Sequence, residues 1–557
     1  MKEEEKLLNL DIQKDQQKQT LSNPHGIKLY FFNALYTILQ NDGFNQFCNI
    51  LLIIFQFIQL MAFPMDTIFS SGWKNYWYST IGPFFRYSQL ITLWKSNFQF
   101  YLITYIIIFL YILFILIGFI YLIIQSSSIS FVSKFINKIM PFLIELEIAL
   151  NIPFLRTLFA VYICENDNLE ISSDIKCNSS IHIFLIVIST IFIFIFLCLF
   201  LLFRCTLFEY GVNYNKLKAA YTSSTEVLLE IAKFLLIILY QFITEEVSLS
   251  IITFVISLIL LLNFIYKEPF SNGFIMKLYL ILYLLFFWSS TICIISILLR
   301  NSKFEGGVLL LLIGYPLIII SISLTEWDFS FDKIFEFINS KDSDGYKALL
   351  DIEFFLKMED FLADKIRTKE QKILYSYISN YEKTCADINC ALKKFLSIPL
   401  KLENFVEMKI FLLQHGEMLY KNALAKFPFN AKLRLSYGLF LFSRLHKKLQ
   451  GINEITLLNK FNTNLEDSFL IYKAQRYIQE NYDDSLNLNN NSNQEQNSNF
   501  INSITYKNTL NNVKSLIGKI TINYIDFWTI LAISDENKSD NFQKMSQIGT
   551  KISKLSE

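Results

Sequence analysis

The chain has 557 residues, 53% of them hydrophobic, and its 50 Lys and Arg nearly balance 49 Asp and Glu, giving a net charge of +1. A nucleic-acid-binding function is set aside, because it needs a clustered basic face that this balanced composition does not indicate. Eight cysteines scattered along the chain argue against a disulfide framework. The charged first 25 residues lack the apolar stretch of a cleavable signal peptide.

Long apolar runs are concentrated before Thr325 and predict a polytopic helical membrane domain. A helix that crosses a hydrocarbon core about 30 Å thick needs roughly 20 apolar residues. Eight runs approach this length, at about 45–64, 99–124, 139–162, 181–203, 227–244, 249–266, 278–299 and 307–325. The third contains Pro153 and several polar residues, so it predicts either one broken span or an interfacial helix followed by a short one.

Basic residues between the runs predict the orientation, since cytoplasmic loops collect Lys and Arg. With eight spans and a cytoplasmic N-terminus, the loops on the cytoplasmic side hold Lys134 and Lys138, then Arg204, Lys216 and Lys218, then Lys267 and Lys277. Both termini are therefore expected in the cytoplasm. Which membrane is crossed does not follow from the sequence.

The loop between the third and fourth runs is expected on the opposite side. In it, Cys164 and Cys177 bracket an acidic stretch, and Asn178 begins an Asn-Ser-Ser glycosylation acceptor. An oxidising compartment favours a disulfide between the two cysteines. The alternative is two unrelated thiols beside a chance acceptor sequence in an Asn-rich chain.

The fold class predicted for the whole chain is all-α. A cytoplasmic segment, 1–44, precedes the transmembrane domain, 45–325, and a cytoplasmic helical domain, 326–482, follows it. Helices are expected from Tyr346 and at about 369–394, 401–427, 430–449, 465–481 and 505–532. An Asn-rich linker, 483–503, is expected to be disordered, and 504–557 holds a final amphipathic helix and tail.

The segment LYKNALAKFPFNAKLRLSYGLFLF, from Leu419 to Phe442, resembles a tetratricopeptide-like unit. Tyr420, Ala423 and Phe427 would share one helix, and Tyr437 and Gly438 would pack back from the next, with the small residues permitting close approach. One unit cannot bury its apolar face alone. Neighbouring helices are therefore expected to form an array, which the last helix closes with Trp528 as a buried anchor.

The order of several segments resembles the Tiny macrocysts protein B family of multispan membrane proteins. They are the apolar runs, TCADINC at 384–390, the segment above, DSFLIYKAQRYIQE at 467–480 and INYIDFWTIL at 522–531. The resemblance implies architecture more than mechanism. Relatives often carry sensory PAS modules further downstream, and none is visible in this sequence.

Two groups of residues each allow a functional and a structural interpretation. Cys385 and Cys390 form C-x4-C, but a structural zinc site needs four ligands, and His415 and His446 lie at no recognisable spacing. Packed, reduced thiols are the other interpretation, and no cofactor is expected.

Charged residues at membrane depth form the second group. They are Glu145, Glu147, Arg156, Glu230 and Lys233. Such groups mark ion or proton paths, or they form buried ion pairs that hold helices together.

No nucleotide-binding, hydrolase, metalloprotease or kinase signature occurs, so an enzyme is not expected. The predicted function is a membrane scaffold or signalling protein. The bilayer surrounds its spans, and its helical region binds protein partners. The alternative is a channel or transporter with the helical region as regulatory domain. Homo-oligomers are possible in either case.

Overall fold

The computed structural model describes most of the apolar half and part of the remainder. The described residues are 24–41, 43–70, 73, 82–85, 87–89, 98–124, 131–165, 168–208, 210, 219–299, 307–324, 345–363, 405–458, 461, 463–487, 521, 523–525 and 527–528. The chain divides into two compact units, 1–474 and 475–557. The fold and sites described below belong to the first unit.

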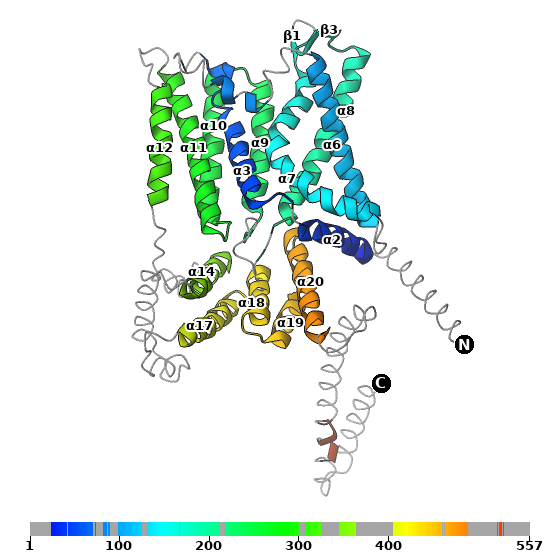
Figure 1. The fold of residues 1–557 in the computed structure, drawn as a ribbon, viewed down its shortest axis with the longest axis vertical. Helices are drawn as coiled ribbons and strands as arrows, with labels where there is room; N and C mark the ends of the chain where they lie inside the picture. Colours follow the sequence, from blue (N-terminus) through cyan, green and yellow to red (C-terminus); the bar gives the residue numbers. More distant parts are fainter. Residues whose placement is uncertain are drawn as a thin grey trace, which may run out of the picture. The chain divides into compact units, whose positions relative to one another are not determined.

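Each of the eight apolar runs forms a helix. These helices, which we call the membrane bundle, are α3 (Gln46–Met61), α6 (Phe98–Ile124), α7 (Phe131–Phe159), α8 (Ser180–Thr206), α9 (Ser224–Phe242), α10 (Glu246–Lys267), α11 (Gly273–Leu298) and α12 (Gly307–Leu324). They stand side by side, and α2 (Pro24–Gln40) lies across one end (Figure 1).

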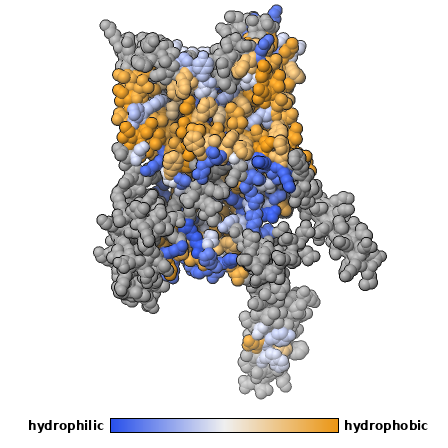
Figure 2. Space-filling view, in the orientation of Figure 1, coloured by the Kyte–Doolittle hydropathy of each residue, from blue (hydrophilic) through white to orange (hydrophobic). Residues whose placement is uncertain are grey.

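Four of these helices, α6, α8, α10 and α11, are long and apolar enough to cross a membrane. Their outward faces carry exposed Ile, Leu and Phe side chains, which form an apolar belt around the bundle (Figure 2). Water disfavours such a belt, whereas lipid accepts it. Among the other described helices, α3 and α12 are apolar but shorter, and α7 and α9 carry charged residues.

α7 is one continuous helix although it contains Pro141 and Pro153. A proline inside a helix has no N–H to offer the carbonyl four residues earlier. For Pro153 that carbonyl belongs to Ala149, and the buried Gln59 side chain of α3 donates to it at 2.8 Å. A side chain of a neighbouring helix thus supplies the hydrogen bond that the proline cannot donate.

The loop after α7 contains a small sheet that the all-α expectation omits. A short 3-10 turn, η2 (Ala160–Tyr162), leads into β1 (Cys164–Glu165), β2 (Asn168–Leu169) and β3 (Ser172–Lys176). The strands pair antiparallel in the order β1-β2-β3. Strands this short carry no readable alternation of apolar and polar residues, so the sequence does not predict them.

The helical region comprises α14 (Gly345–Ala363), α17 (Phe405–Lys426), α18 (Ala431–Ser443), α19 (Lys448–Leu457) and the part of α20 (Leu465–Asn487) up to Ala474. The helix expected at 430–449 is two helices, α18 and α19. The chain turns between them at His446, whose φ of 54° is left-handed and incompatible with a continuing helix. Asn430 is the N-cap of α18, and its side chain accepts a hydrogen bond from the Leu433 N–H.

Tyr420, Ala423 and Tyr437 are all buried, as the predicted packing requires, while Phe427 is half-buried. The buried Tyr420 hydroxyl donates to Glu353 of α14 and contacts the Ser436 hydroxyl at 2.9 Å.

Gly438 is predicted to bring its helix close to the helix of Ala423, which is α17. In the structure Gly438 lies against α19 instead. A Cβ on Gly451 of α19 would lie 2.6 Å from the Gly438 carbonyl oxygen, so the glycines bring α18 against α19.

The prediction for Trp528 is wrong, because its side chain is 61% exposed. It belongs to the second unit, and its described ring contact is with Phe527. An apolar stripe predicts that one face of a helix packs against another surface, but it does not identify the segment that provides that surface. The expected helix at 369–394, Cys385 and Cys390, most of the Asn-rich linker and most of the final helix lie outside the described residues.

Candidate functional site

A network of buried charged side chains joins α7, α8 and α9. Arg204 of α8 contacts Glu147 of α7 at 2.6 Å and Glu230 of α9 at 3.4 Å. The Lys233 ammonium lies 2.7 Å from the same Glu230. Asn151 donates to both carboxylates and so bridges them. We call these five residues the charge network.

The charge network is buried and internally compensated. Glu147 and Lys233 have no exposed surface, and Glu230 is 4% exposed. Two carboxylates face two cations, so the four charges sum to zero. Charges at this depth are costly unless they are paired and hydrogen-bonded, and here each carboxylate has both a cation and an amide. The network therefore constrains how three helices meet.

The other two predicted polar residues lie apart from the charge network. Arg156 lies 3.7 Å from Asp66, and its guanidinium stacks over the Phe63 ring at 4.7 Å. Glu145 accepts a hydrogen bond from the Phe44 N–H at 2.5 Å and thereby ties α7 to the chain segment before α3. The five predicted residues thus occupy three places rather than one path.

A cavity of about 120 Å³ lies beside the charge network, at the end of the bundle that carries α2. Its polar wall includes Asn49, Glu145, Glu147, Arg204 and Glu226, and much of the rest is aliphatic or aromatic. Thr222, Ser223 and Phe208, which connect bundle helices, also line it.

A second polar cluster, which we call the junction, joins the membrane bundle to the helical region. Lys432 of α18 and Glu466 of α20 form an ion pair at 2.6 Å. The Ser223 N–H, just before α9, donates to Glu466 at 3.4 Å. From the loop after α8, the Tyr210 hydroxyl donates to the Lys432 carbonyl at 3.0 Å. Burial raises the pKa of Tyr210 well above its ordinary value, so the hydroxyl keeps its proton as a donor.

Further contacts extend the junction along α20. The Phe32 ring of α2 meets Phe469 edge-on at 5.6 Å, and the Tyr472 hydroxyl donates to Asn33 at 3.4 Å. The Lys473 ammonium donates to the Phe208 carbonyl at 3.4 Å. Phe208 and Ser223 therefore line the cavity and also hold α20.

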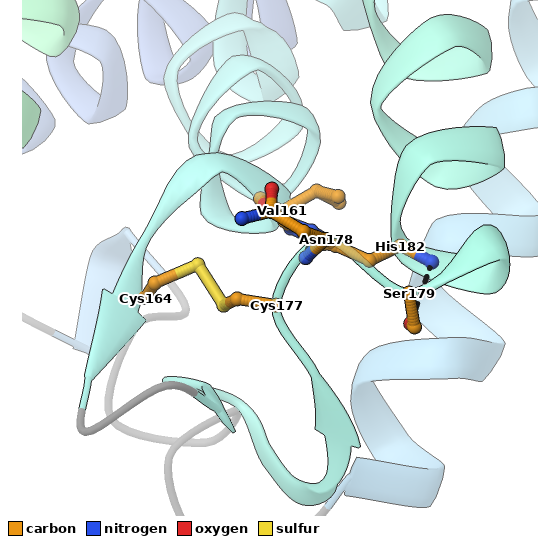
Figure 3. The surroundings of a disulfide bond; sticks show 6 residues. All are labelled: Val161, Cys164, Cys177, Asn178, Ser179 and His182. Atoms are coloured by element: carbon orange, nitrogen blue, oxygen red, sulfur yellow. Dashed lines mark hydrogen bonds between the residues drawn. A yellow bond between two sulfur atoms is a disulfide. The ribbon is translucent and has the colours of Figure 1, made fainter.

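The predicted disulfide between Cys164 and Cys177 is confirmed, with the two Cα atoms 6.3 Å apart. It ties β1 to the turn after β3, at the end of the bundle remote from α2 (Figures 1 and 3). Asn178, exposed in that turn, has a left-handed φ of 65° that asparagine tolerates. Its glycosylation stays a prediction.

His182 lies in the first turn of α8, close to the disulfide (Figure 3). The Asn178 N–H donates to its Nδ1 at 3.1 Å, so Nε2 carries the proton and donates to the Val161 carbonyl at 2.8 Å. The ligand atoms of His182 and the two cysteines lie within 4.8 Å of one another. A metal would need thiolates, and the cysteines are joined to each other. His182 therefore orients the loop.

Three of the five charge-network residues, Glu147, Glu230 and Lys233, are predicted from the sequence, whereas Arg204 and the bridging Asn151 are not. Arg204 lies in the last turn of α8 directly after an apolar run, so it was assigned to a loop. The unbroken apolar run that leads up to Arg204 indicates that the residue belongs to the helix. Among the described residues, neither His415 nor His446 lies in a group of possible metal ligands. Burial lowers the pKa of His415 to about 3, and its ring packs on Phe355.

Comparison with known proteins adds no family. No protein-family model, curated protein or solved structure matches the chain.

Breaking the charge network should destabilise the bundle. Lys233→Met leaves Glu230 buried with the longer contact to Arg204 as its remaining described cation partner, and breaking a buried pair in this way costs about 3–5 kcal/mol. The full-length protein in detergent should show this loss in an equilibrium unfolding titration. Adding Glu230→Gln should recover part of it.

Lys421→Met is the matched control. Lys421 pairs with Glu417 at 2.8 Å but is 60% exposed, so its loss should cost under about 1 kcal/mol. Equal effects of Lys233→Met and Lys421→Met would show that the charge network contributes no special stability.

Proposed function

We propose that this protein is an integral membrane signalling or scaffold protein whose helical region responds to the state of the membrane bundle. The observation that carries this proposal is the junction, where Glu466 binds Lys432 of the helical region and the Ser223 N–H of the bundle. A change at the start of α9 alters the position of α20 through this carboxylate. The helical region thereby acts as the output.

The charge network supplies the bundle side of this coupling. Arg204 lies near the end of α8, four residues before Phe208, whose carbonyl accepts from Lys473 of α20. Glu230 lies two turns into α9, seven residues after Ser223. Two of the three helices that meet in the charge network, α8 and α9, are therefore the helices whose ends hold the junction.

The stacked helices of the helical region support a role in binding protein partners. Tetratricopeptide-like arrays use such surfaces for protein recognition, and the hairpin of α17 and α18 has the buried Tyr420 and Ala423 that such a unit needs. On this proposal the chain belongs with the Tiny macrocysts protein B family. Assembly into homo-oligomers is compatible with it.

The proposed topology has eight spans, with the helical region in the cytoplasm and the disulfide loop outside. The disulfide supports it, because such bonds persist in oxidising compartments and this one lies at the end of the bundle remote from α2. The basic loops support the same orientation.

A channel or transporter is the second candidate, favoured by the cavity beside the charge network. Against it, the charges of the network are compensated by one another, which suits a structural lock better than a conducting path.

The orientation predicts opposite protease sensitivities of two segments. In sealed vesicles with the cytoplasmic face outward, added protease should remove a C-terminal epitope tag, while the peptide joining Cys164 to Cys177 survives. Detergent should make both segments accessible. A protected tag beside a digested loop would reverse the topology.

The coupling predicts that a change in the bundle is detected in α20. Arg204→Gln should speed amide hydrogen exchange at residues 466–474 several-fold in reconstituted full-length protein, because it frees the end of α8. Lys138→Gln, an exposed charge change on α7 outside the charge network, should leave this exchange unchanged.

Two further measurements complete the test. If Arg204→Gln proves misfolded by size exclusion, Glu466→Gln tests the reverse direction, and exchange at the start of α9 should rise. Unchanged exchange in folded variants contradicts the coupling. Selective sodium, potassium or proton flux in liposomes that Glu147→Gln abolishes would establish transport instead.

A further inference from the structure

We propose that the cavity beside the charge network binds an organic ammonium ion, either a free small amine or the headgroup of a membrane lipid. It lies where α2, α3, α7, α8 and α9 meet. Its volume of about 120 Å³ exceeds several-fold the roughly 10–15 Å³ that one water molecule needs. A ligand of several non-hydrogen atoms therefore fits.

The charges on the wall favour a cation. Three carboxylates, those of Glu145, Glu147 and Glu226, line the cavity. Arg204 is the basic residue on the described wall, and both Glu147 and Glu230 already contact its guanidinium. Because Arg204 is already paired, Glu145 and Glu226 leave the described wall with more negative than positive charge, which a cation would balance.

An unpartnered polar atom of Asn49 is an independent observation beside the cavity. Its side chain lines the cavity and is only 9% exposed. The Nδ2 group donates to the Phe44 carbonyl at 3.2 Å, but the Oδ1 atom has no hydrogen-bond partner. An unsatisfied buried acceptor costs about 1–3 kcal/mol. An ammonium N–H or a polarised N–CH₃ group in the cavity would satisfy it once the Asn49 amide turns toward the cavity.

The remaining wall distinguishes an organic cation from a metal ion. Among the described residues, the carboxylates of this cavity do not form a cluster within 4.8 Å that would cage a metal. Aromatic side chains line it instead, including Phe203, Phe270 and Tyr279, and the last two rings lie 4.5 Å apart. Aromatic faces bind alkylammonium ions through their negative quadrupole. Apolar walls with carboxylates suit this chemistry.

The cavity is placed to act on the proposed output. Ser223 and Phe208 line it, and these are the residues that bind Glu466 and Lys473. A ligand here would contact the attachment of α20 directly. This consequence rests on the proposed function, whereas binding itself is measured without it.

Choline chloride is the probe, with the full-length protein in nanodiscs of phosphatidylglycerol, which has no ammonium group. Choline should raise the melting temperature saturably, beyond sodium chloride at equal ionic strength. Glu226→Gln should weaken choline binding at least tenfold, and Leu39→Trp, which fills the cavity, should abolish it. Glu454→Gln is the matched control, because Glu454 pairs with Arg434 in the helical region.

Nanodiscs of phosphatidylcholine distinguish the sources. If the lipid headgroup occupies the cavity, this lipid should itself give the stabilisation, choline should add nothing, and Glu226→Gln should remove the difference between the two lipids. A free amine as ligand predicts the choline shift in both lipids.

The proposal is overturned if choline acts no differently from sodium chloride and the two lipids give equal stability. A saturable shift with sodium phosphate that Glu226→Gln strengthens would also overturn it and identify an anion site at Arg204. Neither result changes the expected outcome of the hydrogen-exchange test of the junction. The proposed ligand and the proposed coupling can therefore be contradicted independently of each other.

Discussion

The pairing of Glu147 and Glu230 with Arg204 and Lys233 is the interaction on which the rest of the structure depends. A charge inside a membrane bundle is tolerated only beside its counter-charge, so this network permits few arrangements of α7, α8 and α9. The chain segments that leave these helices form the cavity and the junction. One constraint therefore sets the position of the attachment points of α20.

Backbone hydrogen bonding imposes a second constraint at the same depth. Pro153 leaves the Ala149 carbonyl without its helical partner, and Gln59 supplies one. Because this bond crosses from α3 to α7, it fixes the two helices together where polar side chains would otherwise be costly. Gln59 also donates to the Ser88 carbonyl, so the loop after α3 is held by the same side chain.

Apolar runs predict the bundle helices well, because a membrane helix needs a long apolar stretch whatever its neighbours are. The disulfide was predictable for a similar local reason, since two cysteines bracket one loop. Contacts between distant segments were not. Arg204 and Glu147 are 57 residues apart, and the orphaned Asn49 oxygen arises from packing. Such features depend on which helices meet, as does the division of α18 from α19 at His446.

Cysteine cross-linking of Ser223 to Glu466 tests most directly whether the helical region is attached at the junction. In membranes, with Cys205→Ala removing a nearby thiol, Ser223→Cys and Glu466→Cys should form a disulfide on mild oxidation. Ser223→Cys with Glu417→Cys should not, because Glu417 pairs with Lys447, beyond the end of α18 remote from Lys432. Absence of the first cross-link, or equal yields from both pairs, would contradict the account.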